Sequence, residues 1–166
     1  VIEETFRTAT VHQAYIEPHA CVAKVEADGQ GEIWSSSQGH FTVRALTAKL
    51  LNMPLGDLRV FPAEIGGGFG GKTVVYVEPV AAMLSKKSGF PVRVQMSREE
   101  VFRASGPTSG SSMRVKIGVT KDGKITAADG EFRFQAGAFP GSPVMNACLC
   151  AFAPYDIPNA RTVGYD

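Results

Sequence analysis

The sequence predicts an α+β fold, with layered mixed or antiparallel sheets and a few packed helices. Three observations support this fold class. Short alternating segments are typical of strands, two Asp-Gly pairs indicate hairpins, and the helical segments occur singly between strands. Because strands and helices follow one another without a regular βαβ rhythm, a doubly wound parallel sheet is not expected.

The first third of the chain predicts three strands and one helix. Asp28-Gly29 is a hairpin signal between two alternating segments. A helix is expected over residues 41–51, because apolar residues recur there at spacings of three and four, and Pro54 stops it. The expected strands lie at residues 20–25, 32–35 and 58–61.

The rest of the chain predicts three further helices, placed between strands. One helix has Pro79 in its first turn and Gly89 as a C-terminal cap. The next, which runs to about residue 104, begins with a capping box formed by Ser97 and Glu100. The third is expected at residues 144–152, and the strands at 91–96, 113–120, 124–134 and 160–165.

The composition excludes several classes of function. The 166 residues are 44% hydrophobic, which is enough to build a core in roughly one domain. The net charge is +1 and the longest basic run is Lys86-Lys87, so neither nucleic acid nor an anionic membrane surface is an expected partner. Residues 134–155 are uncharged, but glycine and proline interrupt them, and no membrane span is expected.

The three cysteines indicate a reducing compartment, and we expect a cytoplasmic protein. Cys148 and Cys150 are too close in sequence for an easy mutual disulfide or a four-ligand zinc site. They are expected to behave as small hydrophobic side chains.

The segment GGGFGGKT at residues 66–73 carries most of the functional information. Five glycines in six positions allow backbone N–H groups to face a shared hollow, and they let a ligand approach where a side chain would block it. An anionic ligand is therefore the natural occupant.

The glycine segment also fits two widespread nucleotide-binding patterns. It matches both G-x-x-x-x-G-K-[ST] and G-x-G-x-x-G. A phosphate-binding loop should lead directly into a long helix, yet residues 73–77 are rich in β-branched side chains and Pro79 follows. A nucleotide hydrolase is therefore a minor alternative, and a glycine-rich turn that merely packs tightly is another.

Four further segments accompany the glycine run. They are YIEPHACVA at residues 15–23, SSQ at 36–38, QAGAF at 135–139 and PYDIPN at 154–159. In this order, and together with GGGFGGK, they resemble the molybdopterin-binding large subunit of the xanthine dehydrogenase and aldehyde oxidase family. The resemblance covers nearly all of the chain, and it implies the fold of part of that molybdopterin-binding domain.

The resemblance implies a molybdenum-molybdopterin cofactor, either as Mo-pterin or as Mo-pterin cytosine dinucleotide. In this family the pterin sulfurs hold the metal, so no direct metal ligand is expected. Gln38 matches the glutamine whose amide approaches an oxygen on molybdenum, and Gly68, Phe69 and Gly70 match positions that lie against the cofactor. Without the family, Gln38 would be interpreted as an exposed glutamine at a helix start, and Phe69 as a core anchor.

The resemblance also assigns Phe69 and Thr73 to the substrate pocket. Purine-oxidising relatives have a glutamate in the place of Thr73, so a xanthine-type substrate is not expected. Glu17 is at least as well explained by capping a turn as by catalysis. The family's general base lies far towards the C-terminus, so no catalytic residue is expected within residues 1–166.

The family resemblance predicts that residues 1–166 form a partial cofactor-binding domain, truncated at its C-terminal side. The parent oxidoreductase would hydroxylate or dehydrogenate a small aldehyde or N-heterocycle and pass electrons to iron–sulfur clusters. Its partners would be the remainder of the large subunit and the iron–sulfur and FAD domains or subunits. The isolated piece is expected to be inactive. The competing hypothesis is a non-catalytic binding or interaction domain on the same fold.

Overall fold

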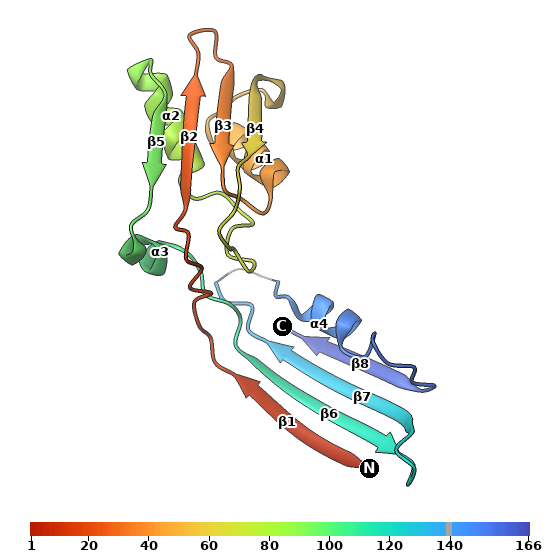
Figure 1. Ribbon diagram of the computed structural model, residues 1–166. Coiled ribbons are helices and arrows are strands. Elements are labelled where there is room, and N and C mark those ends of the chain that lie inside the picture. Colours follow the sequence, from red (N-terminus) through yellow and green to blue (C-terminus); the bar gives the residue numbers. More distant parts are fainter. Residues whose placement is uncertain (139–140) are drawn as a thin grey trace. The chain divides into compact units, whose positions relative to one another are not determined.

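The computed structural model describes residues 1–138 and 141–166 and divides into two compact units (Figure 1). The terminal unit joins Val1–Val11 to Thr108–Asp166, and the central unit is His12–Pro107. Each unit contains one four-stranded sheet; among the described residues, several helices accompany the central sheet and α4 accompanies the terminal one. The predicted α+β class with mixed sheets is confirmed.

The central unit is built on a mixed sheet in the order β4-β3-β2-β5, with two helices on one face (Figure 1). β2 pairs antiparallel with β3 and with β5, whereas β3 pairs parallel with β4. Its elements are β2 (Ala20–Val25), β3 (Gly31–Ser35), α1 (His40–Leu50), η1 (Leu55–Asp57), β4 (Leu58–Pro62), α2 (Glu78–Ser88), β5 (Val92–Gln95) and α3 (Arg98–Ala104).

The core of the central unit lies between this sheet and helices α1 and α2. Alternate residues of β2 and β3 point into it, as the strand period requires, and Ile33 and Leu58 are fully buried. Ala81 and Ala82 lie on the buried side of α2, where their small side chains let the helix approach the sheet closely.

The parallel pairing of β3 and β4 brings the two predicted site segments together. Ser35 and Pro62 are register partners at the C-terminal ends of these strands, so the segments that follow the two strands leave the sheet side by side. The segment that follows β3 carries Gln38, and the segment that follows β4 carries the glycine run. Glu78, the first residue of α2, accepts a hydrogen bond from Ser35 Oγ at 2.6 Å and fixes the far end of the second segment.

The terminal unit is a second mixed sheet, in the order β1-β6-β7-β8. β1 and β7 pair antiparallel with β6, and β8 pairs parallel with β7. Phe139, which belongs to one of the segments that carry the family resemblance, lies outside the described residues. The elements are β1 (Ile2–Thr8), β6 (Ser111–Val119), β7 (Ile125–Phe134), α4 (Val144–Cys150) and β8 (Ala160–Tyr165).

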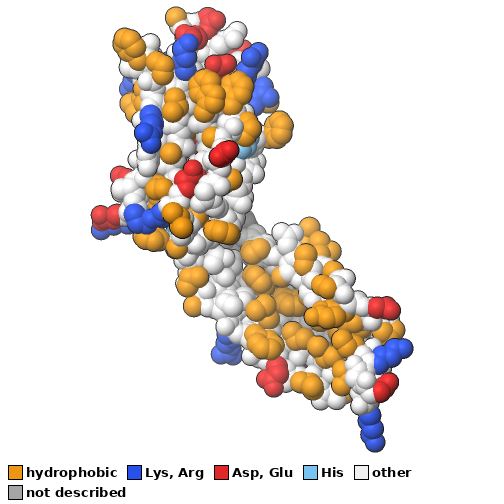
Figure 2. All heavy atoms as spheres, in the orientation of Figure 1, with side chains coloured by type: hydrophobic (Ala, Val, Ile, Leu, Met, Phe, Trp, Pro, Cys, Tyr) orange, Lys and Arg blue, Asp and Glu red, His pale blue; other side chains and the backbone are white. Residues whose placement is uncertain are grey.

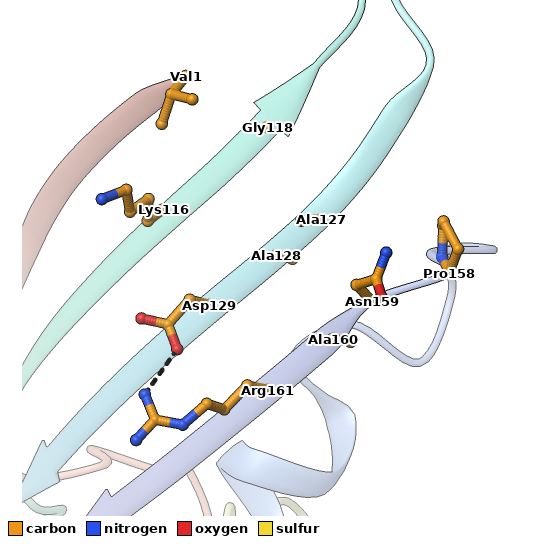
Figure 3. Close-up of a pocket in the computed structure, with 10 residues that line it drawn as sticks. All are labelled: Val1, Lys116, Gly118, Ala127, Ala128, Asp129, Pro158, Asn159, Ala160 and Arg161. Atoms are coloured by element: carbon orange, nitrogen blue, oxygen red, sulfur yellow. Dashed lines mark hydrogen bonds and ion pairs between the residues drawn. The ribbon is translucent and has the colours of Figure 1, made fainter.

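One face of the terminal sheet is charged. Arg161 donates to Asp129 across β7 and β8 at 3.0 Å (Figure 3), and Arg114 bridges Asp129 and Glu3. A cavity of about 560 Å³ lies beside this pair, but it contains none of the residues predicted for the functional site. The charges are partly solvated and contribute little to stability individually.

The other face of the terminal sheet is apolar. Over β7 and β8 it is covered by α4, whose Val144 and Cys148 lie so close to Gly164 that a Cβ there would meet them at 2.8 and 2.9 Å. Figure 2 shows hydrophobic side chains gathered on this unit. Over β1, β6 and the first residue of β7 the face carries a groove, which Glu4 borders as a charged residue among apolar ones. The apolar lining residues are Ile2, Phe6, Val115, Ile117, Val119 and Ile125.

The helices and strands predicted from the sequence are present, with ends that differ by a few residues. The sequence does not predict β1 or the short turn η1. Every residue of β1 is exposed, so no alternation of buried and exposed positions marks it, and its pairing with the distant β6 forms it.

A buried polar cluster lies at the start of the central unit. Tyr15 Oη and His19 Nε2 are 2.5 Å apart, and Ser105 Oγ contacts both Tyr15 Oη and His12 Nε2. Burial, followed by the neighbouring Lys72 ammonium, lowers the pKa of His19 to about 4. His19 is therefore neutral near pH 7, which fits its place in the core.

We expect Ile33→Ala to lower the free energy of unfolding by about 2–5 kcal/mol, because it leaves a cavity in the centre of the core. Urea denaturation measures this loss. The matched control is Ile16→Ala, at a side chain that is 91% exposed, which should change the free energy by less than about 0.5 kcal/mol. Equal effects at the two positions would contradict the described core.

We expect His19 to make the protein less stable as pH falls. The pKa of His19 is about 4 in the folded protein and 6.5 ordinarily, so between these values the unfolded chain binds a proton that the folded chain excludes. The free energy of unfolding should therefore fall from about pH 6.5 to about pH 4. In His19→Gln this part of the decline should disappear, as urea denaturation at a series of pH values will show. An unchanged slope in the variant would refute the assignment.

Candidate functional site

The residues predicted to contact cofactor or substrate lie together in the central unit. Gln38 precedes α1, and the other four residues lie in the segment between β4 and α2. Gln38 and Gly70 are joined by a hydrogen bond, and Thr73 is tied back to the same loop by a bond from its Oγ1 to the Gly70 carbonyl. Together these contacts form one exposed site at one edge of the sheet.

The side chain of Gln38 has a defined orientation. Its Oε1 accepts hydrogen bonds from the N–H of Gly70 at 3.0 Å and from the N–H of Lys72 at 3.1 Å. Two backbone donors can face only the oxygen of a carboxamide, so the NH₂ group points the other way. Within residues 1–138 and 141–166 this NH₂ group makes no hydrogen bond, and it is left as a neutral donor at the surface.

Glycine is required where the loop approaches neighbouring side chains. A Cβ at Gly68 would lie 2.5 Å from Gln38 Oε1, and a Cβ at Gly71 would lie 2.7 Å from Tyr15 Cε1. By contrast, a Cβ at Gly70 would meet nothing within 4 Å, although its φ of +87° favours glycine. The glycine run therefore packs tightly on one side and is open on the other.

Phe69 is exposed at the surface of the loop. Its side chain is 74% exposed, and its backbone has a left-handed φ of +51°, which is uncommon for a residue with a side chain. The interpretation of Phe69 as a core anchor is therefore wrong. Its ring is available to form one wall of a binding site.

Lys72 faces inward. It is 1% exposed, and its Nζ contacts Glu17 Oε2 at 2.6 Å and lies 5.0 Å from the centre of the Tyr15 ring. Residues 73–77 form no helix, since α2 begins only at Glu78. The nucleotide-hydrolase alternative requires a lysine that reaches phosphates from a helix start, so the observed arrangement contradicts it.

Glu17 holds the glycine loop from its interior side through hydrogen bonds. Its Oε2 accepts from the Gly66 N–H at 2.9 Å as well as from Lys72 Nζ. Burial raises the pKa of Glu17, but the bonds from Lys72 and Gly66 outweigh burial and hold the pKa below its ordinary value. Glu17 is thus an ionised structural residue, in line with the turn-capping interpretation.

The sequence did not identify Tyr15, Glu17 and Lys72 as the support of the loop. The sequence did contain one indication, namely Lys72 directly after the glycine run. A lysine side chain that turns inward requires a partner of opposite charge. The partner lies far away in sequence, at Glu17, and only the fold brings the two together.

A cavity of about 840 Å³ borders Gln38. It lies between the start of α1 and β4, and its lining combines a carboxamide, a histidine, aromatic rings and arginines. The lining residues are Gln38, Gly39, His40, Phe41, Thr42, Arg44, Gly56, Arg59, Val60, Phe61 and Pro62.

Two further kinds of feature are absent from the described part of the chain. No group of three or more His, Cys, Asp or Glu side chains is placed to hold a metal ion there. None of the helices described is both long enough and apolar enough to cross a membrane.

Comparison with known proteins connects this geometry to a family. The chain is 31% identical over 167 residues to a probable xanthine dehydrogenase subunit of Bacillus subtilis, covering 99% of this chain and 22% of that protein. It is 32% identical over 164 residues to the nicotinate dehydrogenase large molybdopterin subunit of Eubacterium barkeri, covering 97% of this chain and 39% of that one. The chain thus spans well under half the length of either relative.

A solved structure shares the fold. The aldehyde oxidoreductase from Desulfovibrio gigas superposes with a TM-score of 0.76 at 24% identity, covering 98% of this chain and 18% of that one. The family model described as the molybdopterin cofactor-binding domain matches residues 1–166. Because that match runs along the full chain, the chain belongs to the molybdopterin cofactor-binding domain family.

Proposed function

We propose that this chain is the part of a molybdenum hydroxylase large subunit that presents Gln38 and the glycine loop to the cofactor. The observation that carries this proposal is the orientation of the Gln38 amide, whose oxygen is held by Gly70 and Lys72 while its NH₂ group is left as a donor. A neutral donor suits an oxygen on molybdenum because it orients the group without changing the charge of the site.

The residues present fit the molybdenum-molybdopterin cofactor. When bound, the cofactor supplies the redox chemistry by which an aldehyde or heterocycle carbon is oxidised. Gln38 would donate a hydrogen bond from its amide NH₂ group to the cofactor. Gly68 allows that amide to lie against the loop without a clash. Phe69 forms an apolar wall that excludes water, and Gly70 keeps the neighbouring backbone open to the cofactor.

The Gly70 N–H positions the side chain of Gln38. It donates to Gln38 Oε1, so its proton orients the glutamine and is not offered to the cofactor directly. The proposed cofactor-binding residues remain Gln38, Gly68, Phe69 and Gly70. No residue of the chain is proposed as a metal ligand or a catalytic base.

The proposed substrate is a small aldehyde or N-heterocycle that is not of the xanthine type. Support comes from the family resemblance, which implies a glutamate at the position of Thr73 in purine-oxidising relatives. The Thr73 hydroxyl instead donates to the Gly70 carbonyl at 3.2 Å. A relative named nicotinate dehydrogenase acts, by its name, on an N-heterocycle. Phe69 and Thr73 are the residues proposed to line the substrate pocket.

The proposed partners lie elsewhere in the parent enzyme. They are the remainder of the large subunit, iron–sulfur clusters that receive the electrons, and FAD. We further propose a cytoplasmic location, a pterin that is either Mo-pterin or its cytosine dinucleotide, and an isolated chain without turnover. The uncovered apolar groove over β1 and β6 supports packing against the remainder of the large subunit.

We expect Gln38→Glu in the full-length parent to lower turnover per molybdenum by about a hundredfold or more, the range seen when one well-placed donor is removed. The variant keeps an oxygen for the N–H groups of Gly70 and Lys72 but replaces the NH₂ donor by a second oxygen. Molybdenum content, measured in parallel, separates loss of the donor from loss of the cofactor.

The matched control is Gln30→Ala, in the exposed turn between β2 and β3, which should leave turnover and molybdenum content unchanged. Normal turnover in Gln38→Glu would overturn the role assigned to the amide. A parent protein that binds no molybdenum at all would instead indicate the non-catalytic domain.

A further inference from the structure

We propose that the partly buried ion pair of Lys72 and Glu17 positions the Gln38 amide, which makes Lys72 a positioning residue. This inference rests on the proposed function of Gln38. It gives a role to the lysine of the glycine segment. That role is not the binding of a phosphate or another anionic ligand, because the ammonium group faces the interior.

The backbone of Lys72 holds Gln38 from two sides. Its N–H donates to Gln38 Oε1 at 3.1 Å, and its carbonyl accepts from the Gln38 N–H at 2.8 Å. The same carbonyl accepts from Ser37 Oγ at 3.0 Å. The position of the Lys72 backbone therefore determines where the carboxamide of Gln38 points.

The side chain of Lys72 fixes that backbone. Its Nζ is 2.6 Å from Glu17 Oε2, which also accepts from the Gly66 N–H at 2.9 Å. One carboxylate oxygen thus holds both ends of the glycine run. The Glu17 N–H returns a bond to the Gly66 carbonyl at 3.3 Å, so this end of the loop is fixed by backbone as well as by side chain.

Glycine makes such an anchor necessary. A backbone of five glycines in six positions has large conformational freedom. Phe69 is exposed, so its side chain does not restrict the loop by packing. Tyr15 packs below the loop, where its ring approaches both Gly71 and the ammonium group of Lys72. The ion pair and the tyrosine, together with the hydrogen bonds between Glu17 and Gly66, therefore restrict the loop from the interior side.

A double-mutant cycle in the full-length holoenzyme tests this role. We expect Lys72→Met to lower turnover per molybdenum by about tenfold or more in the wild-type background, because it releases the loop that orients the amide. In the Gln38→Glu background, where the donor is already lost, the same change should cost less than about twofold. Lys49→Met, at an exposed lysine of α1, is the control and should have no effect in either background.

Hydrogen exchange provides a readout that is independent of activity. In Lys72→Met the amides of Gly70 and Lys72 should exchange about tenfold faster or more, whereas those of α2 should stay protected. Glu17→Gln keeps the shape of the partner and removes only its charge, so it should accelerate exchange of the same amides by a smaller factor. This variant provides the test if Lys72→Met fails to fold.

The outcomes separate the two proposals. If Gln38→Glu retains normal turnover, the proposed function fails. If Gln38→Glu loses turnover but Lys72→Met has the same effect in both backgrounds, only the positioning role fails. Unchanged exchange of the loop amides in both Lys72→Met and Glu17→Gln would overturn the positioning role as well.

Discussion

The site depends on one constraint, the fixed orientation of the Gln38 carboxamide. Two backbone N–H groups, from Gly70 and Lys72, occupy its oxygen and leave its NH₂ group as an outward donor. A glutamine at the surface would otherwise sample many rotamers, and its two ends would be interchangeable as donor and acceptor. The glycine run removes this ambiguity, since only a residue without a side chain at position 68 leaves room for the amide.

The fold supplies this constraint through sheet topology. Parallel pairing places the ends of β3 and β4 side by side, so that two connections distant in sequence meet at one edge. Below them, Glu17 and Lys72 form an ion pair in which the lysine is almost completely buried, and Tyr15 packs against the loop. Removal of the Glu17 carboxylate would leave the buried Lys72 charge without its partner, so this support is sensitive to a single substitution.

Much of the fold could be predicted from local signals. The capping box of Ser97 and Glu100 and the left-handed Gly89 cap both occur as the sequence indicates. β1 could not be predicted, because its register is set by β6 and none of its residues is buried. Local patterns identify elements that carry their own periodicity or caps, whereas an exposed strand is defined by its partner.

The same distinction applies to the site. The sequence identified the glycine segment and Gln38, but their convergence and the donor role of the amide follow from contacts between distant segments. The inward direction of Lys72 was equally hidden, because its partner, Glu17, belongs to a segment that precedes β2. Phe69 was open to two interpretations until its exposure was known.

The most direct measurement is a crystal structure of the molybdenum-loaded full-length enzyme. The account predicts that Gln38 Nε2 lies within hydrogen-bond distance of an oxygen on molybdenum while Oε1 still accepts from the loop. A cofactor bound elsewhere, or a Gln38 amide turned away from it, would contradict the account.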